Sequence, residues 1–169
     1  FPGSVIFCNV NVTDEASVAA GIARTMKELG GIHICCNFAG TGNAMRTMGK
    51  NGPFPLAEFN RIIQINLVGT FNVLRLCAEK MADNAVLNED GGRGVIINTA
   101  SIAAYEGQIG QAAYSASKGG VVGMTLPIAR DLSAVGIRVN TIAPGLIDTP
   151  IYGEGEASDA FKAHLGQSV

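Results

Sequence analysis

The sequence predicts an α/β fold, in which a parallel β-sheet is covered by helices on both faces. Short apolar segments of strand length alternate along the chain with longer segments in which apolar residues recur at helical spacing. Three of the four strand segments are continuously apolar rather than alternating, which is typical of parallel strands buried on both faces. Ligands of such folds bind beyond the carboxyl ends of the strands, so we expect a site there.

Local sequence signals place the individual elements. Asp14 begins a helical pattern and Gly30-Gly31 ends it, as glycine often does just past a helix. Gly, Asn and Pro residues indicate a loop at 41–55, and the segment 56–83 is one long helix or two, apolar on several faces and therefore buried. We also expect strands at 4–10, 32–37, 94–99 and 137–143, a polar turn at 88–94, and a helix at 111–135.

Length and composition indicate one domain, residues 1–169, that binds neither nucleic acid nor a membrane. The 169 residues are 47% hydrophobic and 15% charged, with a net charge of −2. No Lys/Arg-rich run offers a footprint for nucleic acid or an anionic surface. No apolar stretch reaches the roughly 18 residues of a membrane span, and no cluster has the spacing of metal ligands, so no metal is expected.

The four cysteines indicate a reducing compartment. None belongs to a CxxC pair, and each lies within an apolar segment. Free cysteine packs like a small hydrophobic residue, so we expect Cys8, Cys35, Cys36 and Cys77 to be reduced core residues. The cytoplasm is the default location.

Tyr114 and Lys118 form the strongest local signal for chemistry. Four residues apart in a helical segment, they lie on one face, and a nearby ammonium favours the phenolate of a tyrosine. The pair suits a proton donor, although YxxxK alone is more often a pair on a helix surface. Ser101 follows the third strand, where its hydroxyl would bond a substrate oxygen; a serine after a strand is otherwise a cap or turn residue.

A longer segment around these residues resembles a known family. In GVIINTASIAAYEGQIGQAAYSASKGG a strand leads to the serine and then to Tyr-x-x-x-Lys, which is similar to the catalytic segment of the short-chain dehydrogenase/reductase family. The resemblance extends beyond the motifs to the type II 3-hydroxyacyl-CoA dehydrogenase group. Four further motifs resemble the family in the same order along the chain: Asn11-Val12-Thr13-Asp14, Asn37-Phe38-Ala39-Gly40, Asn66 within NLVGTFNV, and Pro144-Gly145 followed by Thr149.

The resemblance implies a Rossmann-type, doubly wound parallel sheet and an NAD-dependent oxidoreductase. The enzyme would interconvert a small-molecule secondary alcohol and a ketone, above all 3-hydroxyacyl-CoA and 3-ketoacyl-CoA. Members of the family pair through the two long helices, which implies a homotetramer here. Members of the group also work in the mitochondrial matrix, which makes that compartment the alternative to the cytoplasm.

The resemblance also implies a role for each motif residue. Tyr114 would be the acid–base, and Lys118 would favour its phenolate and bind the nicotinamide ribose. Ser101 would orient the substrate oxygen, and Asn66 would hold a relay water. Gln108 would contact the acyl group. The cofactor would further meet Asn11, Val12, Asn37, Phe38, Ala39, Gly40, Pro144, Gly145, Ile147 and Thr149.

Departures from the family pattern bear on these expectations. Asn11 stands where the family has aspartate, although an amide oxygen still accepts from an adenine amino group, and Phe38 replaces a small or polar residue. The glycine-rich turn that cradles the pyrophosphate and the last strand are not found, so we expect an incomplete domain that lacks its N-terminal βα units. In the strand order 3-2-1-4-5-6, segments 4–10 and 32–37 would be strands 3 and 4, which are not neighbours.

Two alternative functions stay open at this point. An NADPH-dependent ketoacyl reductase of the same fold would differ at the end of strand 2, so NADP is the alternative to NAD. A catalytically silent binding or scaffold protein is favoured by the missing phosphate turn. The intact set of Ser101, Tyr114 and Lys118 argues against it.

Overall fold

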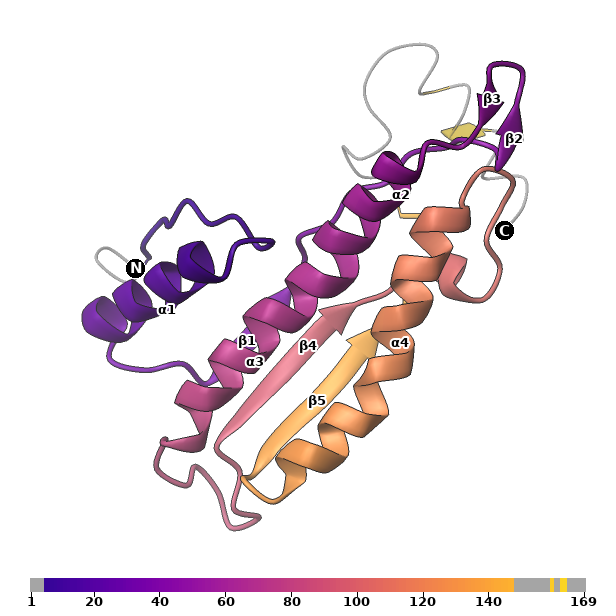
Figure 1. Ribbon diagram of the computed structural model, residues 1–169. Coiled ribbons are helices and arrows are strands. Elements are labelled where there is room, and N and C mark those ends of the chain that lie inside the picture. Colours follow the sequence, from indigo (N-terminus) through magenta and orange to yellow (C-terminus); the bar gives the residue numbers. More distant parts are fainter. Residues whose placement is uncertain (1–4, 148–158, 160–161, 164–169) are drawn as a thin grey trace.

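A parallel three-stranded sheet forms the centre of the molecule in the computed structural model, which describes residues 5–147, 159 and 162–163 (Figure 1). Its strands are β1 (Ile34–Asn37), β4 (Gly94–Thr99) and β5 (Ile137–Ile142), in the order β1-β4-β5. Both pairs of neighbours are parallel. The last three predicted strands are therefore confirmed as adjacent and parallel.

Helices make the crossovers between these strands. α4 (Ala112–Ser133) connects β4 to β5 and matches the predicted helix within two residues at each end, and a longer helical segment connects β1 to β4. Parallel strands need such connections because the chain must return to the edge of the sheet from which it started. The crossover pattern is the one that the alternation of strand and helix segments predicts.

α1 (Glu15–Leu29) has the ends that the sequence indicates. The Asp14 carboxylate accepts a hydrogen bond from the N–H of Ser17 at 3.1 Å, which caps the first turn. Gly30 ends the helix with φ +82°, a left-handed conformation that glycine adopts without steric cost, and its N–H bonds to the carbonyl of Met26.

The helical segment between β1 and β4 is not a single α-helix. α2 (Leu56–Ile63) passes through one π-helical turn, Gln64–Val68, into α3 (Gly69–Ala82). The sequence predicted one long helix or two at 56–83. The structure has one continuous helical segment that contains a single π-helical turn. Such turns are rare and occur frequently at functional sites. This one contains Asn66, whose side chain is fully buried.

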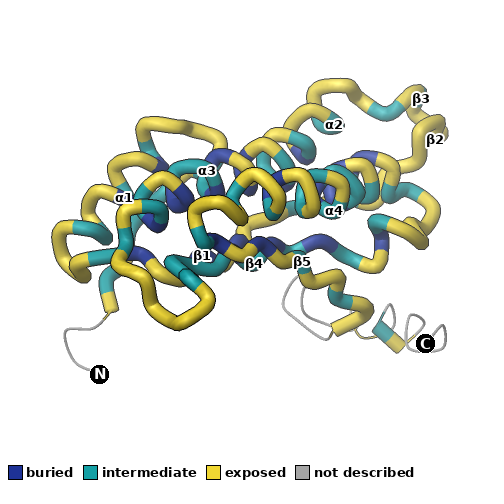
Figure 2. The backbone as a smooth tube through the Cα atoms, turned by 90° about the horizontal axis from the view of Figure 1, so that it is seen from below, coloured by how far each residue is buried: buried dark blue, intermediate teal, exposed yellow. Residues whose placement is uncertain are grey.

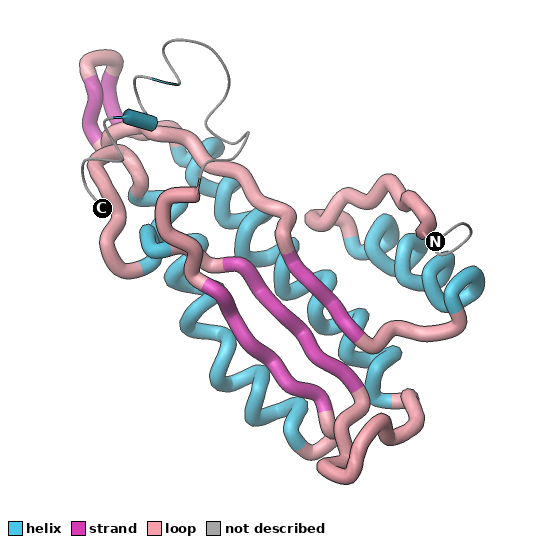
Figure 3. Tube along the Cα trace, turned by 180° about the vertical axis from the view of Figure 1, so that it is seen from behind, coloured by secondary structure: helices cyan, strands magenta, loops and turns pink. Residues whose placement is uncertain are grey.

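The hydrophobic core lies between the sheet and the helices on one of its faces (Figure 2). Cys35, Ile96 and Val139 lie opposite one another on this face and are buried. Ile34 and Arg138 point to the other face and are exposed. No helix of the described residues covers that second face (Figure 3), so the burial of both faces that the apolar runs predicted is not seen there.

The strand predicted at 4–10 is not formed. Residues 5–10 alternate between exposed and half-buried but pair with no described strand, and Cys8 and Val10 lie against Gly21 of α1. A cavity of about 450 Å³ lies between this segment and β1. A strand forms only where its backbone groups find a partner, and apolar composition does not show whether one is present. The expectation that this segment and β1 are not neighbours in the sheet agrees with the structure.

The loop predicted at 41–55 contains a short antiparallel hairpin. It consists of β2 (Met48–Gly49) and β3 (Gly52–Pro53), which extend from the end of the molecule where the active-site candidates lie. Within the described part of the chain, no helix combines the length and the apolar composition needed to cross a membrane.

Candidate active site

Tyr114 and Lys118 lie one turn apart at the start of α4, next to the carboxyl ends of β1 and β4. The Lys118 ammonium donates to the carbonyl oxygen of Thr99, the last residue of β4, at 2.7 Å, and lies 5.7 Å from the centre of the Tyr114 ring. A Cβ added to Gly40, three residues past β1, would be 3.6 Å from the same ammonium. The shared helix face predicted from the spacing is confirmed.

Burial controls the charge of Lys118. The residue is 5% exposed, and no carboxylate of the described residues pairs with its ammonium. Removal from water disfavours the charged form, so the pKa of Lys118 lies below its ordinary value. An ammonium has three donors and only one of them is bonded to Thr99, so the others are available to a ligand hydroxyl.

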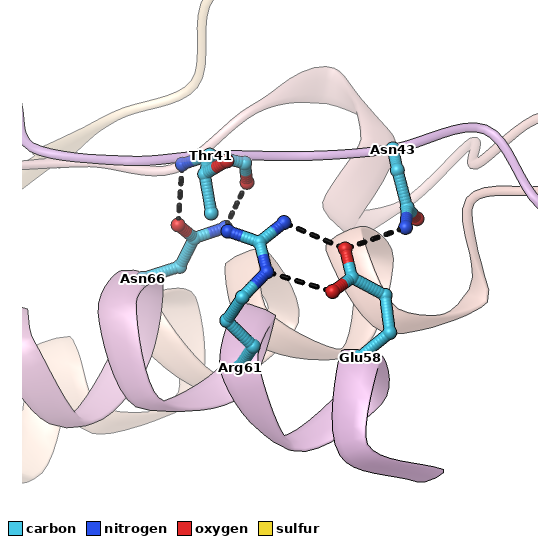
Figure 4. A network of polar contacts seen from close by, with 5 residues as sticks. All are labelled: Thr41, Asn43, Glu58, Arg61 and Asn66. Carbon is cyan, nitrogen blue, oxygen red and sulfur yellow. Dashed lines mark hydrogen bonds and ion pairs between the residues drawn. The ribbon is translucent and has the colours of Figure 1, made fainter. Parts of the chain in front are cut away.

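Asn66 joins the π-turn to the loop that follows β1 (Figure 4). Its Oδ1 accepts from the N–H of Thr41 at 2.8 Å, and its Nδ2 donates to the carbonyl of Thr41, also at 2.8 Å. Two opposed hydrogen bonds from one amide fix the position of that backbone. The residue that the resemblance makes the holder of a relay water therefore also holds the loop.

Ser117 links Asn66 to the catalytic helix, a role that sequence reasoning missed. Its hydroxyl receives a hydrogen bond from Nδ2 of Asn66 at 2.9 Å and donates to the carbonyl of Tyr114 at 2.7 Å. The residue is 0% exposed. Its place inside YSASK, three residues after Tyr114, was a signal, but its partner on the π-turn is distant in sequence.

Gly42 brings the same loop against Tyr114. A Cβ at Gly42 would lie 3.1 Å from Cδ2 of the Tyr114 ring, which is tighter than nearly all real contacts of this kind. A residue with a side chain would therefore require the ring or the loop to move. The glycine-rich composition of the loop predicted its irregular shape but not this contact.

Ser101 lies two residues past β4, at the sheet edge predicted for it. It caps the short helix Ile102–Ala104, and its Oγ accepts from the N–H of Ala103 at 3.1 Å. The N–H of Ile102 bonds to the carbonyl of Pro144 at 2.9 Å. Ser101 thus has the cap role that the sequence left open, while its hydroxyl proton stays available to an acceptor.

The turn after β1 has a buried and an exposed part. Asn37 is 8% exposed, and its Nδ2 donates to Oδ1 of Asn98 on β4 at 2.9 Å. Phe38 and Ala39, in contrast, are exposed. Asn37 therefore holds two strands together, and the residues that follow it are the ones open to a ligand.

Asn11 and Val12 lie against α3. Nδ2 of Asn72 donates to the carbonyl of Val12 at 3.0 Å. Oδ1 of Asn11 already accepts from the N–H and the hydroxyl of Thr13, at 3.1 and 2.9 Å. The amide oxygen expected to accept from adenine is thus engaged within the chain, which leaves the amide nitrogen as the available group.

The remaining candidate residues have fewer contacts with the carboxyl edge of the sheet. Gln108 is exposed, and its backbone N–H bonds to Oε1 of Gln111 at 2.8 Å. Gly145 and Ile147 are exposed after β5. Thr149 lies outside the described residues. The described residues contain no cluster of His, Cys, Asp or Glu suited to a metal ion.

A second polar network secures the loop to α2 (Figure 4). Glu58 accepts from Nδ2 of Asn43 at 2.7 Å and from two nitrogens of Arg61 at 2.6 and 2.7 Å. The hydrogen bonds from Arg61 hold the pKa of Glu58 below its usual value, although partial burial opposes the shift. The loop over Tyr114 is therefore fixed at two points.

Comparison with known proteins decides the family. The short chain dehydrogenase family matches residues 2–159. This chain belongs to that family. It is 55% identical over 151 residues to 3-hydroxyacyl-CoA dehydrogenase type-2 of Rattus norvegicus and 56% identical over 149 residues to that of Drosophila melanogaster. The alignments cover 88% and 87% of this chain but 58% of each relative, so the chain spans less than two thirds of their length.

Solved structures of short-chain dehydrogenases agree with the fold. The crystal structure of 3-hydroxyacyl-CoA dehydrogenase type-2 from Mycobacterium avium is 48% identical, with a TM-score of 0.80 over 86% of this chain and 57% of that one. NAD⁺-bound xylitol dehydrogenase is 31% identical, with a TM-score of 0.72 over 90% of this chain and 53% of that one. The Rossmann-type fold expected from the sequence is confirmed.

The described residues fit one end of a nicotinamide cofactor. Lys118 offers unbonded donors for ribose hydroxyls, and the half-buried Tyr114 lies next to it. A Cβ at Gly40 would lie close to the Lys118 ammonium, so the absence of a side chain there keeps space beside Lys118. The glycine-rich turn expected for the pyrophosphate is not among residues 5–147, so the phosphate end has no counterpart in them.

Proposed function

We propose that the complete protein is an NAD-dependent oxidoreductase that interconverts 3-hydroxyacyl-CoA and 3-ketoacyl-CoA. The observation that supports this above all is a phenol, Tyr114, next to a buried ammonium, Lys118, that is bonded to the carboxyl end of a parallel strand. A bound nicotinamide cofactor would supply the hydride acceptor and donor. The substrate class rests on the identity to proteins named 3-hydroxyacyl-CoA dehydrogenase type-2.

The residues of the chain would move and guide one proton. Tyr114 takes the proton of the substrate hydroxyl during oxidation and returns it to the carbonyl oxygen during reduction. Ser101 donates its free hydroxyl proton to the same substrate oxygen and so orients it. Lys118, one helical turn away, presents its unbonded ammonium donors to the ribose of the cofactor.

The other assignments belong to the same proposal. Asn66 fixes the loop at Thr41 and the helix at Ser117, and holds the relay water near them. Gln108 contacts the acyl group. The cofactor contacts are Asn11, Val12, Asn37, Phe38, Ala39, Gly40, Pro144, Gly145, Ile147 and Thr149. We place the protein in the cytoplasm, with the mitochondrial matrix as the alternative that subcellular fractionation would distinguish.

The decisive experiment replaces Tyr114 with phenylalanine in the complete protein. Loss of one acid–base group lowers kcat by about 10²–10⁴-fold, whereas the ring still fills its space, so NAD binding should stay close to that of the parent. Initial rates with a 3-hydroxyacyl-CoA and NAD, together with cofactor titration by fluorescence, measure both effects. Tyr105→Phe is the matched control, because Tyr105 is 70% exposed and should keep full activity.

Three results would contradict the proposal. A Tyr114→Phe enzyme within tenfold of the parent would remove the acid–base role. Turnover with NADPH and not with NAD would favour a ketoacyl reductase of the same fold. A folded complete protein that binds neither cofactor would favour a silent binding or scaffold protein.

A further inference from the structure

Cys35, Cys77 and Ser117 carry nucleophilic groups, are buried, and take no part in the proposed proton transfer. The two thiols pack in the hydrophobic core, as the sequence predicted. The same prediction is wrong for Cys36, which is exposed, because neighbours along a strand point to opposite faces. Of the three buried groups, only the Ser117 hydroxyl is bonded to the backbone of Tyr114.

The Ser117 hydroxyl takes part in two hydrogen bonds of different reach. It donates its single proton to the carbonyl of Tyr114 at 2.7 Å, a bond that a serine inside a helix often makes with the preceding turn. Its oxygen also accepts from Nδ2 of Asn66 at 2.9 Å. The first bond is local to α4, whereas the second joins α4 to a residue 51 positions away, on the π-turn.

The bond to Ser117 completes the contacts of the Asn66 amide. Nδ2 has two protons, of which one goes to the carbonyl of Thr41 and the other to Ser117. Oδ1 accepts from the N–H of Thr41 (Figure 4). Asn66 is 0% exposed, so solvent does not reach this amide. Without the hydroxyl, a buried N–H would lack an acceptor, which favours rotation or displacement of the amide.

A separate apolar contact keeps the π-turn packed on α4. A Cβ at Gly120, three residues after Ser117, would lie 2.6 Å from Cδ2 of Leu67, so the two elements approach each other closely there. Such packing is non-directional and does not orient the Asn66 amide. Removal of the hydroxyl should therefore leave the two elements in contact while it frees the amide.

We propose, on the basis of the function proposed for Tyr114, that Ser117 is a positioning residue that acts on this phenol through the Asn66 amide. Asn66 holds the backbone of Thr41, and at the next residue, Gly42, a Cβ would lie 3.1 Å from the Tyr114 ring. The same hydroxyl is bonded to the Tyr114 carbonyl. One buried hydroxyl thus fixes both the backbone that carries the phenol and the loop that faces it.

Lys118 is held by a different contact. Its ammonium donates to the carbonyl of Thr99 at 2.7 Å, and neither Ser117 nor Asn66 takes part in that bond. Loss of the Ser117 hydroxyl should therefore impair proton transfer by Tyr114 more than binding of the cofactor ribose. The expected signature is a lower kcat with little change in the affinity for NAD.

Hydrogen exchange at Thr41 tests the structural link without any turnover. The N–H of Thr41 is bonded to Oδ1 of Asn66, so a freed amide should expose it to exchange more often. In the complete protein with Ser117→Ala, we expect the peptides that contain Thr41 to exchange about fivefold faster, the factor typical of one lost hydrogen bond. Mass spectrometry measures this rate.

Thr125→Val is the matched control on the same helix. Its hydroxyl also takes part in two hydrogen bonds, to the carbonyl of Val121 at 2.8 Å and to Oγ1 of Thr141 at 2.5 Å. Valine keeps the shape of the side chain and removes both bonds. This variant should lose some stability, but it should keep the exchange rate at Thr41 and the kcat of the parent.

Kinetics of the complete protein then test the effect on Tyr114. With a 3-hydroxyacyl-CoA and NAD, Ser117→Ala should lower kcat by about tenfold or more, as small misplacements of reacting groups typically do. Titration by fluorescence should give an NAD affinity close to that of the parent. In an Asn66→Ala background most of the effect of Ser117→Ala should disappear, because residues that act through one network are not additive.

These measurements separate the proposal from the function on which it rests. A complete parent protein without turnover would contradict the dehydrogenase function, while the exchange rate at Thr41 would still decide the link. The positioning role is wrong if Thr41 exchanges at the parent's rate in Ser117→Ala, if kcat and NAD affinity fall equally, or if the effects of Ser117→Ala and Asn66→Ala add. Ser117→Cys, which has a similar shape and a weaker acceptor, carries the same tests should Ser117→Ala fail to fold.

Discussion

Lys118 is both deeply buried and part of the candidate active site. The residue is 5% exposed, its ammonium is bonded to one carbonyl, and burial lowers its pKa. An ammonium in such a place costs stability, which a protein tolerates where the charge has a task. The spacing of Tyr114 and Lys118 made this pair predictable from the sequence, because helix geometry alone puts the two residues on one face. The depth of its burial depends on distant segments and was not predictable.

The pH dependence of stability should reveal this burial. The folded chain releases the Lys118 proton at a lower pH than the unfolded chain, so the unfolded state binds more protons between the two pKa values. The free energy of unfolding contributed by Lys118 therefore rises with pH through that interval and levels off above the ordinary lysine pKa of about 10.4.

Urea unfolding of the complete protein at neutral pH and at a series of alkaline pH values measures this contribution. Other titrating groups act equally on the parent and on Lys118→Met, so the difference between the two isolates Lys118. We expect the stability of the parent to rise relative to that of Lys118→Met as the pH increases. Equal pH dependence of the two proteins would show that Lys118 is not held in a desolvated state.

The elements were predictable to different degrees. Apolar runs predicted β1, β4 and β5, because buried parallel strands are recognised in a sequence by continuous apolar residues. The same signal was wrong for 4–10, where composition favoured a strand and the described residues offer no partner for one. The π-turn at Gln64–Val68 has no sequence signal that was recognised, since its hydrogen bonds span only one residue more than those of an α-helix.

The loop over the catalytic helix shows what sequence patterns leave out. Composition predicted that 41–55 is irregular, but its position comes from side chains of other elements. Asn66 bonds both backbone groups of Thr41, Glu58 bonds Asn43, and Gly42 is thereby held against the Tyr114 ring. These contacts join residues more than ten positions apart, so no local pattern contains them.

Gly42→Ala tests whether this contact matters for catalysis. The added Cβ would be 3.1 Å from the Tyr114 ring, so the ring or the loop must shift by a few tenths of an ångström. We expect kcat with a 3-hydroxyacyl-CoA and NAD to fall by about tenfold or more, as small misplacements of reacting groups typically cause. The KM for NAD should change less, because Gly42 does not touch the ammonium of Lys118.

The matched control is Gly123→Ala on the same catalytic helix, where an added Cβ meets nothing within 4 Å. It should keep the kcat of the parent and gain a little stability, since alanine favours a helix interior by about 1 kcal/mol over glycine. If Gly42→Ala has the parent's kcat and pH–rate profile, the loop does not position Tyr114.

At the scale of the whole molecule, the helical layer has an outer side that the sheet does not cover. Val68 and Phe71, three residues apart, are 40% and 45% exposed, and Leu126 on α4 is 55% exposed. Apolar groups gathered on the outward sides of two long helices are typical of a contact between subunits. The excess of apolar residues in these helices was visible in the sequence, and the structure places part of it on the surface.

We therefore expect the complete protein to be a homotetramer assembled through α3 and α4. Light scattering at micromolar concentration should give the mass of four chains. An isologous contact pairs the same helices of two subunits, and a second contact of this kind would join two such pairs. The double variant Phe71→Asp with Leu126→Asp places charges in that contact and should produce smaller species, because burying unpaired charges is costly. Leu87→Asp, at a loop residue that is 57% exposed, is the control and should stay tetrameric. A parent protein that scatters as a monomer, or a double variant with the parent's mass, would place any subunit contact on another surface.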